Sequence, residues 1–245
     1  MKKLKNLLNI IIISLAIFFA YQVFSYIKTC HKEKESIQIY KEIKTSSIPR
    51  PSKNNTYQSQ IDFDKLKAIN PEIFAWIRSD EGRIDYPLVR CGDNEKYLHT
   101  AADGQINPMG AVFMDFRNKS LDDDFILIYG HTTNNGTMFG ILNTFKENPK
   151  DTGFSFFTET NEFKTKAVIA AIISGDTEID PRIFDDFEKR KEFYDFLKDK
   201  AVYDISYELK NEDKLISLIT CTYERENSRL LVLTVVENKN LKSIQ

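Results

Sequence analysis

An uncharged apolar run near the N-terminus limits most strongly what this chain can fold into. The run covers residues 7–27 (LLNIIIISLAIFFAYQVFSYI), and about 20 such residues span a bilayer core as a helix. A signal peptide needs a shorter apolar stretch of roughly 7 to 15 residues. Because Lys2, Lys3 and Lys5 precede the run, the positive-inside rule predicts a cytoplasmic N-terminus, with the bulk of the chain outside the membrane.

The residues that follow the apolar run favour an anchor that stays in place. Lys28, Thr29 and Cys30 come next, so no pair of small residues marks a signal-peptidase site. Cys30 raises the alternative of a lipoprotein, but Lys28 and Thr29 stand where a lipidation site requires small residues. We therefore expect an uncleaved single-pass anchor rather than a removed signal or a lipidated cysteine.

The remainder of the chain divides by composition. Residues 31–44 carry apolar side chains at helical spacing, and residues 46–60 hold two prolines and many small polar residues, as expected of a short stem helix and a linker. The expected organisation is a cytoplasmic tail at 1–6, an anchor at 7–27, an extracellular stem and linker at 28–60 and one folded domain at 61–245.

Composition excludes two broad classes of protein. The 18 Phe and 11 Tyr exceed what a disordered chain contains. The net charge is −2, and no block of basic residues interleaved with aromatics is present, so nucleic acid is not an expected partner. Three cysteines, at 30, 91 and 221, are an odd number, so at least one thiol stays unpaired.

The folded domain has the pattern of a β structure interrupted by helices. Six runs rich in Ile, Val, Leu and Phe, separated by turn residues, predict one closed or sandwich-like β domain. These runs are 84–89, 110–115, 125–131, 164–173, 214–221 and 230–236. Helices are expected over 62–77, where Pro71 should break or restart the helix, over 138–145, and over 185–200, where Phe187, Tyr194 and Leu197 form one apolar stripe.

Few residues in this domain could support catalysis. The sequence has no CxxC, HExxH or glycine-rich phosphate loop, so we expect no metal and no cofactor. An activated thiol remains: Cys221 and His131 each end an apolar run, which would place both at one end of a barrel. Arg229 begins the next run and could stabilise an oxyanion. The alternatives are a buried strand cysteine, a surface histidine and an edge-strand arginine.

Several short motifs together resemble the sortases, the thiol transpeptidases of Gram-positive cell walls. The string SLITC at 217–221 is similar to their Thr-Leu-x-Thr-Cys signature, YGH at 129–131 resembles the segment around their histidine, and Arg229 opens the following strand. The stretch NPEIFAWI at 70–77, taken as part of an N-terminal helical pair, YPLV at 86–89 and the helix at 185–200 resemble class B. The resemblance covers roughly residues 61–237.

The resemblance implies both a fold and a site. The fold would be mainly β, a closed eight-stranded barrel with N-terminal helices and a helix inserted between the two strands that precede and bear the cysteine. Cys221, His131 and Arg229 would be catalytic, and Asn94, Leu98 and Thr220 would contact substrate. Ser217 replaces the first Thr of the signature, and no Asp closely follows Cys221, so Cys, His and Arg should act without a third acidic member.

The implied reaction joins a secreted protein to a peptidoglycan precursor at the external surface of the cell membrane. Cys221 would cleave secreted proteins after a Thr in a C-terminal sorting motif, forming a thioester, and an amine of a peptidoglycan precursor would resolve it. Two alternatives stay open from the residues alone. A hydrolytic cysteine peptidase would use the same Cys and His, and a non-enzymatic cell-surface binding module would need neither.

Overall fold

A computed structural model describes residues 2–47, 59–133, 136–149, 152–222, 224 and 226–237. The chain divides into two compact units, residues 1–39 and 40–245. The first unit consists of the greater part of helix α1 (Lys2–Ser46), which is long and apolar enough to cross a membrane by its length and composition. Most of the expected linker, residues 48–58, lies outside the described residues.

The end of α1 belongs to the second unit and is fastened to it by polar and aromatic contacts. The Tyr40 hydroxyl donates to the Gly110 carbonyl at 2.6 Å, and the Tyr40 ring meets Tyr86 edge to face at 5.3 Å between centroids. Lys44 forms an ion pair with Asp85. The ordered domain therefore begins some 20 residues before the boundary expected at residue 61.

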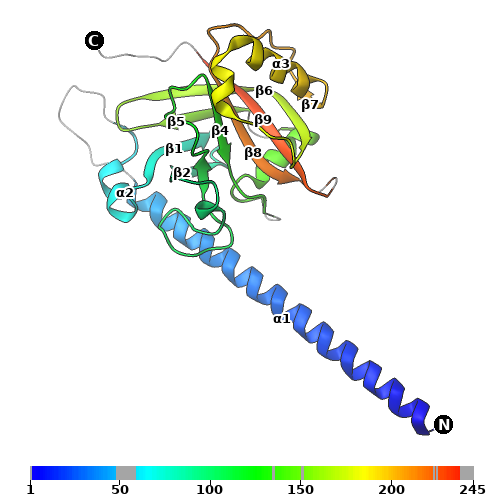
Figure 1. The fold of residues 1–245 in the computed structure, drawn as a ribbon. Helices are drawn as coiled ribbons and strands as arrows, with labels where there is room; N and C mark the ends of the chain where they lie inside the picture. The colour runs from blue at the N-terminus through cyan, green and yellow to red at the C-terminus, as the bar shows by residue number, and fades with distance from the viewer. Residues whose placement is uncertain are drawn as a thin grey trace. The chain divides into compact units, whose positions relative to one another are not determined.

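Eight strands close into a barrel, as predicted. Their order around the ring is β5-β1-β2-β3-β4-β8-β9-β6, and the pairing of β5 with β6 closes it. Figure 1 shows the ring, with β8 and β9 in orange and red. The strands are β1 (Ile73–Ser79), β2 (Asp85–Val89), β3 (Val112–Met114), β4 (Phe125–Tyr129), β5 (Gly153–Phe157), β6 (Glu162–Ser174), β8 (Leu215–Thr222) and β9 (Ser228–Val236).

A helical segment joins β6 to β8 and packs on the outside of the barrel (Figure 1). It contains the 3₁₀ turn η3 (Pro181–Asp185), α3 (Phe187–Lys198) and a short strand, β7 (Ala201–Asp204), that pairs with β6. Tyr194 and Leu197 of α3 join the core beneath it, as the apolar stripe predicts. Phe187, the remaining residue of the predicted stripe, is only half-buried, whereas Arg190 of the same helix is buried.

The guanidinium of Arg190 is hydrogen-bonded to backbone carbonyls. Its guanidinium donates to the carbonyls of Phe184 at 2.6 Å and Asn211 at 2.8 Å. It also reaches Asp124 at 3.2 Å. These bonds tie α3 to the loop before β8, and they satisfy most of the donors that burial would otherwise leave without partners.

The sequence prediction was wrong or incomplete at three places. The stretch 70–77 is not helical: α2 (Phe63–Ile69) ends before Pro71, and β1 follows, paired with β2 and β5. Both faces of β1 are buried, which removes the alternation that marks a strand and makes a short apolar run ambiguous. Strands β5 and β7 were not predicted. The short helix expected over 138–145 is present as the 3₁₀ helix η2 (Gly140–Lys146).

Candidate active site

The barrel places the ends of three neighbouring strands together. Strand β8 lies between β4, to which it is parallel, and β9, to which it is antiparallel. Cys221 is the direct register partner of Arg229 on β9. On the other side Tyr129 pairs with Ile219, and the Gly130 N–H donates to the Ile219 carbonyl at 3.0 Å. His131 therefore follows β4 at the level of Cys221, the next-to-last residue of β8.

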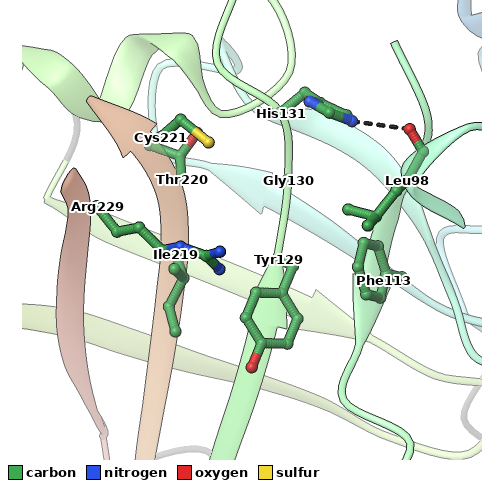
Figure 2. Close-up of a pocket in the computed structure, with 9 residues that line it drawn as sticks. All are labelled: Leu98, Phe113, Tyr129, Gly130, His131, Ile219, Thr220, Cys221 and Arg229. Atoms are coloured by element: carbon green, nitrogen blue, oxygen red, sulfur yellow. Dashed lines mark hydrogen bonds between the residues drawn. The ribbon is translucent and has the colours of Figure 1, made fainter. Parts of the chain in front are cut away.

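These three side chains line one hollow of about 410 Å³. Figure 2 shows the Cys221 sulfur on the side of β8 that faces His131, and the Arg229 guanidinium reaching across β8 toward Tyr129. Cys221 is exposed, so its thiol is open to a substrate. The full lining is Leu98, Phe113, Tyr129, Gly130, His131, Ile219, Thr220, Cys221 and Arg229. The structure thus brings the three predicted catalytic residues together.

A backbone carbonyl orients the imidazole of His131. The His131 Nε2 lies 2.8 Å from the Leu98 carbonyl oxygen (Figure 2). Because a carbonyl only accepts, Nε2 carries the proton in this bond, and Nδ1 is the nitrogen left for proton transfer. Leu98 ends the 3₁₀ helix η1 (Lys96–Leu98), whose start is fixed by Asp93, which accepts from the N–H groups of Glu95 and Lys96 at 2.8 Å each.

Two glycines near His131, Gly130 and Gly110, have no space for a Cβ atom. A Cβ on Gly130 would lie 2.7 Å from the buried ring of Phe139. A Cβ on Gly110, whose φ is +56°, would lie 2.3 Å from the Tyr97 carbonyl oxygen and 3.0 Å from the His131 ring. These two glycines allow the segments on either side of the imidazole to approach it closely.

A buried acid–base cluster lies below the hollow. Asp115 is fully buried and accepts from Arg117 Nε at 2.9 Å and Nη2 at 2.7 Å, from the Tyr129 hydroxyl at 3.1 Å and from Asn94 at 2.9 Å. Burial alone would raise the pKa of Asp115, but the hydrogen bonds from Arg117 and Asn94 hold the pKa below its ordinary value. Burial, and then the Asp115 charge, raise the pKa of Tyr129, so its hydroxyl stays protonated.

A second hollow of about 520 Å³ continues from the first. It shares Tyr129, Ile219 and Arg229 with the first hollow and adds Arg117. Its remaining lining comes from the segment that leaves β6, namely Ile173, Ser174, Gly175, Thr177, Glu178 and Ile179. The two hollows form a continuous lining from His131 to the segment after β6.

The three predicted substrate contacts have different positions. Leu98 and Thr220 line the first hollow, and the Thr220 hydroxyl is buried with no hydrogen-bond partner among the described residues. Asn94 lines neither hollow; it donates to Asp115 and accepts from the Phe116 N–H at 3.1 Å. Tyr129 and Phe113 were not singled out from the sequence, because their strand positions read as ordinary core residues.

Comparison with known proteins identifies relatives along nearly the whole chain. Sortase B of Staphylococcus aureus is 25% identical over 243 residues, which cover 96% of this chain and 98% of the relative. Sortase B of Listeria monocytogenes is 28% identical over 175 residues, covering 68% of this chain and 70% of the relative. No family model matches the chain.

Solved structures agree with the sequence relatives. A Streptococcus pyogenes class B sortase involved in pilus biogenesis superposes with a TM-score of 0.64 at 29% identity, covering 72% of this chain and 98% of that one. A Staphylococcus aureus sortase B–substrate complex superposes with a TM-score of 0.72 at 22% identity, covering 84% of this chain and 98% of that one.

The closed barrel and the similarity along nearly the whole chain support a cysteine transpeptidase of the sortase type. The sequence relatives and the solved structures named above are sortases of class B. The chain is thus similar to the class B sortases along most of its length.

Proposed function

We propose that this enzyme anchors secreted proteins to a cell-wall precursor, with Cys221 as nucleophile, His131 as general acid and base, and Arg229 as oxyanion donor. The observation that carries the proposal is that these three side chains line one hollow at the shared end of β4, β8 and β9. Among the described residues, no group of three or more His, Cys, Asp or Glu side chains could hold a metal ion. The proposed roles therefore rest on the thiol, the imidazole and the guanidinium.

The first half-reaction forms a thioester. The Cys221 thiolate attacks the carbonyl carbon of a Thr in the sorting motif, and the Arg229 guanidinium donates to the oxyanion that develops. His131 holds at Nδ1 the proton taken from the Cys221 thiol, and it gives this proton to the amine of the next residue as the peptide bond breaks, so that the C-terminal fragment leaves. The Thr carbonyl is then bonded to Sγ.

The second half-reaction transfers the protein to an amine. An amine of a peptidoglycan precursor attacks the thioester carbonyl, His131 takes its proton, and Cys221 leaves as a thiolate. Solved sortase B structures include a substrate complex and a complex with triglycine, which supports a peptide donor and an amine acceptor here. If water replaced the amine, the same groups would act as a hydrolytic peptidase.

The proposed setting is the outer face of a cell membrane. Residues 1–6 would be the cytoplasmic tail, 7–27 the single-pass anchor, 28–60 the stem and linker, and 61–245 the catalytic domain. The supporting observation is the apolar helix α1, preceded by lysines. Tethering the enzyme where both substrates are presented raises their effective concentration at the site.

The test incubates the full chain in detergent with a library of sorting peptides and candidate amines, with products read by mass spectrometry. A product that carries the amine joined through the Thr carbonyl supports transpeptidation, and Cys221→Ala should abolish it. Release of free acid alone, with every amine tried, would indicate a hydrolase instead. Binding of a surface protein that is unaffected by Cys221→Ala, with no product, would indicate a binding module.

A further inference from the structure

An ion pair lies immediately beyond the nucleophile, on the side of the hairpin away from the second hollow. Lys146, the last residue of η2, pairs with Glu224 in the turn between β8 and β9. The Lys146 Nζ also donates to the Thr222 hydroxyl at 3.1 Å, and that hydroxyl donates to the Glu224 carboxylate. The three side chains form a closed triangle that includes the residue directly after Cys221.

The Lys146 side of this triangle is connected to the chain around His131. The segment from His131 to η2 closes on itself, because the Phe139 N–H donates to the His131 carbonyl at 3.0 Å and Thr132 bridges to Met138. Asn143 of η2 donates to the Thr132 hydroxyl at 2.9 Å. Hydrogen bonds thus join residues 131–132 to residues 138–146, with the proposed base in the first of these stretches and the lysine at the end of the second.

The ion pair does not touch the space where chemistry would occur. Lys146, Thr222 and Glu224 are all absent from the linings of both hollows. Side chains alternate along a strand, and Thr222 is buried while Cys221 is exposed, so the two point to opposite faces of β8. Any influence of the pair on the thiol therefore passes through the backbone of β8.

Separate hydrogen bonds join the turn of the same hairpin to the segment after β6. The Asn227 amide donates to Asp176 at 2.8 Å, and the Gly175 N–H donates to the Asn227 carbonyl at 2.6 Å. This contact holds the hairpin to the segment after β6. Without Lys146 and Glu224, the hairpin would keep its link to the second hollow but lose its side-chain link to the segment that carries His131.

We propose that Lys146 and Glu224 are positioning residues that hold the end of β8 in register with the His131 segment and so set the approach of the Cys221 thiol to the imidazole. The proposal rests on the proposed roles of Cys221 and His131. Lys146 is 26% and Glu224 35% exposed, and an exposed ion pair contributes only about 0 to 1 kcal/mol to stability. The ion pair acts by positioning the end of β8, so its loss should reduce turnover far more than it reduces the stability of the fold.

The experiment compares four forms of the full chain with the parent: Lys146→Met, Glu224→Gln, both together, and the exchange Lys146→Glu with Glu224→Lys. Each single change should lower kcat for peptide-to-amine transfer about 10-fold, because small misplacements of reacting groups have large effects on rate. KM should stay within a factor of about two. The double variant should be no slower than either single one, and the exchange should recover most of the lost kcat.

The matched control is Lys189→Met on α3. Lys189 pairs with Glu192 at 2.9 Å on the surface, so the change removes the same charge and the same kind of contact elsewhere. It should leave kcat unchanged. The positioning role is overturned if Lys146→Met keeps the parent kcat, if its loss of kcat is matched by a fall in melting temperature, or if the charge exchange stays folded but recovers nothing.

The same assay separates this inference from the proposed function. If Cys221→Ala abolishes transfer while Lys146→Met has the parent kcat, only the positioning role fails. If Cys221→Ala retains transfer, the assignment of the nucleophile fails, and the positioning role fails with it.

Discussion

Cys221 and Arg229 are register partners across the β8–β9 hairpin. Antiparallel partners lie side by side with their side chains on the same face of the sheet, which explains why both line the first hollow. The hairpin fixes the backbone positions of the two residues relative to each other, so the guanidinium and the thiol are presented to the same space for an acyl-transfer step.

This pairing predicts that lysine cannot replace Arg229. An ammonium is a point charge on a flexible stem and lacks the planar fork of donors that a developing oxyanion and a peptide backbone require together. We expect Arg229→Lys to slow transfer about 100-fold or more, the scale of losing an oxyanion donor. Steady-state kinetics with a sorting peptide would measure it, and a rate within a few-fold of the parent would contradict the role.

Cys221 should be the only thiol that transfer requires. Cys91 is partly covered, its thiol donates to the Asp93 carbonyl at 3.2 Å, and burial raises the pKa of Cys91. It lines neither hollow. Cys91→Ser should keep the parent activity, and alkylation followed by peptide mapping should correlate inactivation with label on Cys221. An inactive Cys91→Ser beside an active Cys221→Ala would reverse the assignment.

Gly130 should not accept a side chain. The Cβ of Gly130→Ala would meet the Phe139 ring at 2.7 Å, and that ring is fully buried, so the strain must move the backbone next to His131. We expect a loss of about 1 to 3 kcal/mol in stability and a clear loss of transfer activity. Gly92→Ala is the matched control, because nothing lies within 4 Å of its Cβ. Equal melting temperatures and rates for the two variants would refute the prediction.

Asp115 should make the stability of the domain depend on acid pH. Its pKa is held below the ordinary value of 3.8 in the folded state, so its stabilising contribution is present above about pH 4 and is lost as pH falls through the folded pKa. Asp115→Asn should lower the free energy of unfolding by about 3 kcal/mol at pH 7, the cost of breaking a buried pair. Urea denaturation should show the difference shrinking below pH 4; a difference that does not change with pH would disprove the linkage.

Specificity for the sorting motif should lie in the segment between Ile173 and Lys214. Its first residues, 174–179, contribute half of the residues that line the second hollow, whereas α3 packs Tyr194 and Leu197 into the core. Grafting 174–179 from a sortase with a different motif preference should shift peptide preference, measured by competition between two peptides. Exchanging the exposed positions of α3 should not. A folded, active graft with unchanged preference would place the selective contacts elsewhere.

The sequence alone determined the features that depend on local pattern or on short motifs. The apolar run before residue 28 predicted a helix of membrane-spanning length, and α1 has that length. Each of the six apolar runs overlaps a barrel strand. Because Cys221, His131 and Arg229 stand at strand ends, motif and strand pattern together were enough to place them at one end of the barrel.

Only the tertiary structure decided which distant residues meet. Residues 73–79 form a strand because β2 and β5 pair with both of its edges, and no local periodicity in the sequence records this pairing. Asn94 donates a hydrogen bond to Asp115, 21 positions away in the sequence. Lys146 forms an ion pair with Glu224, 78 positions away. Such contacts form when the barrel closes and brings strand ends together, so their partners are set by the three-dimensional register rather than by spacing along the chain.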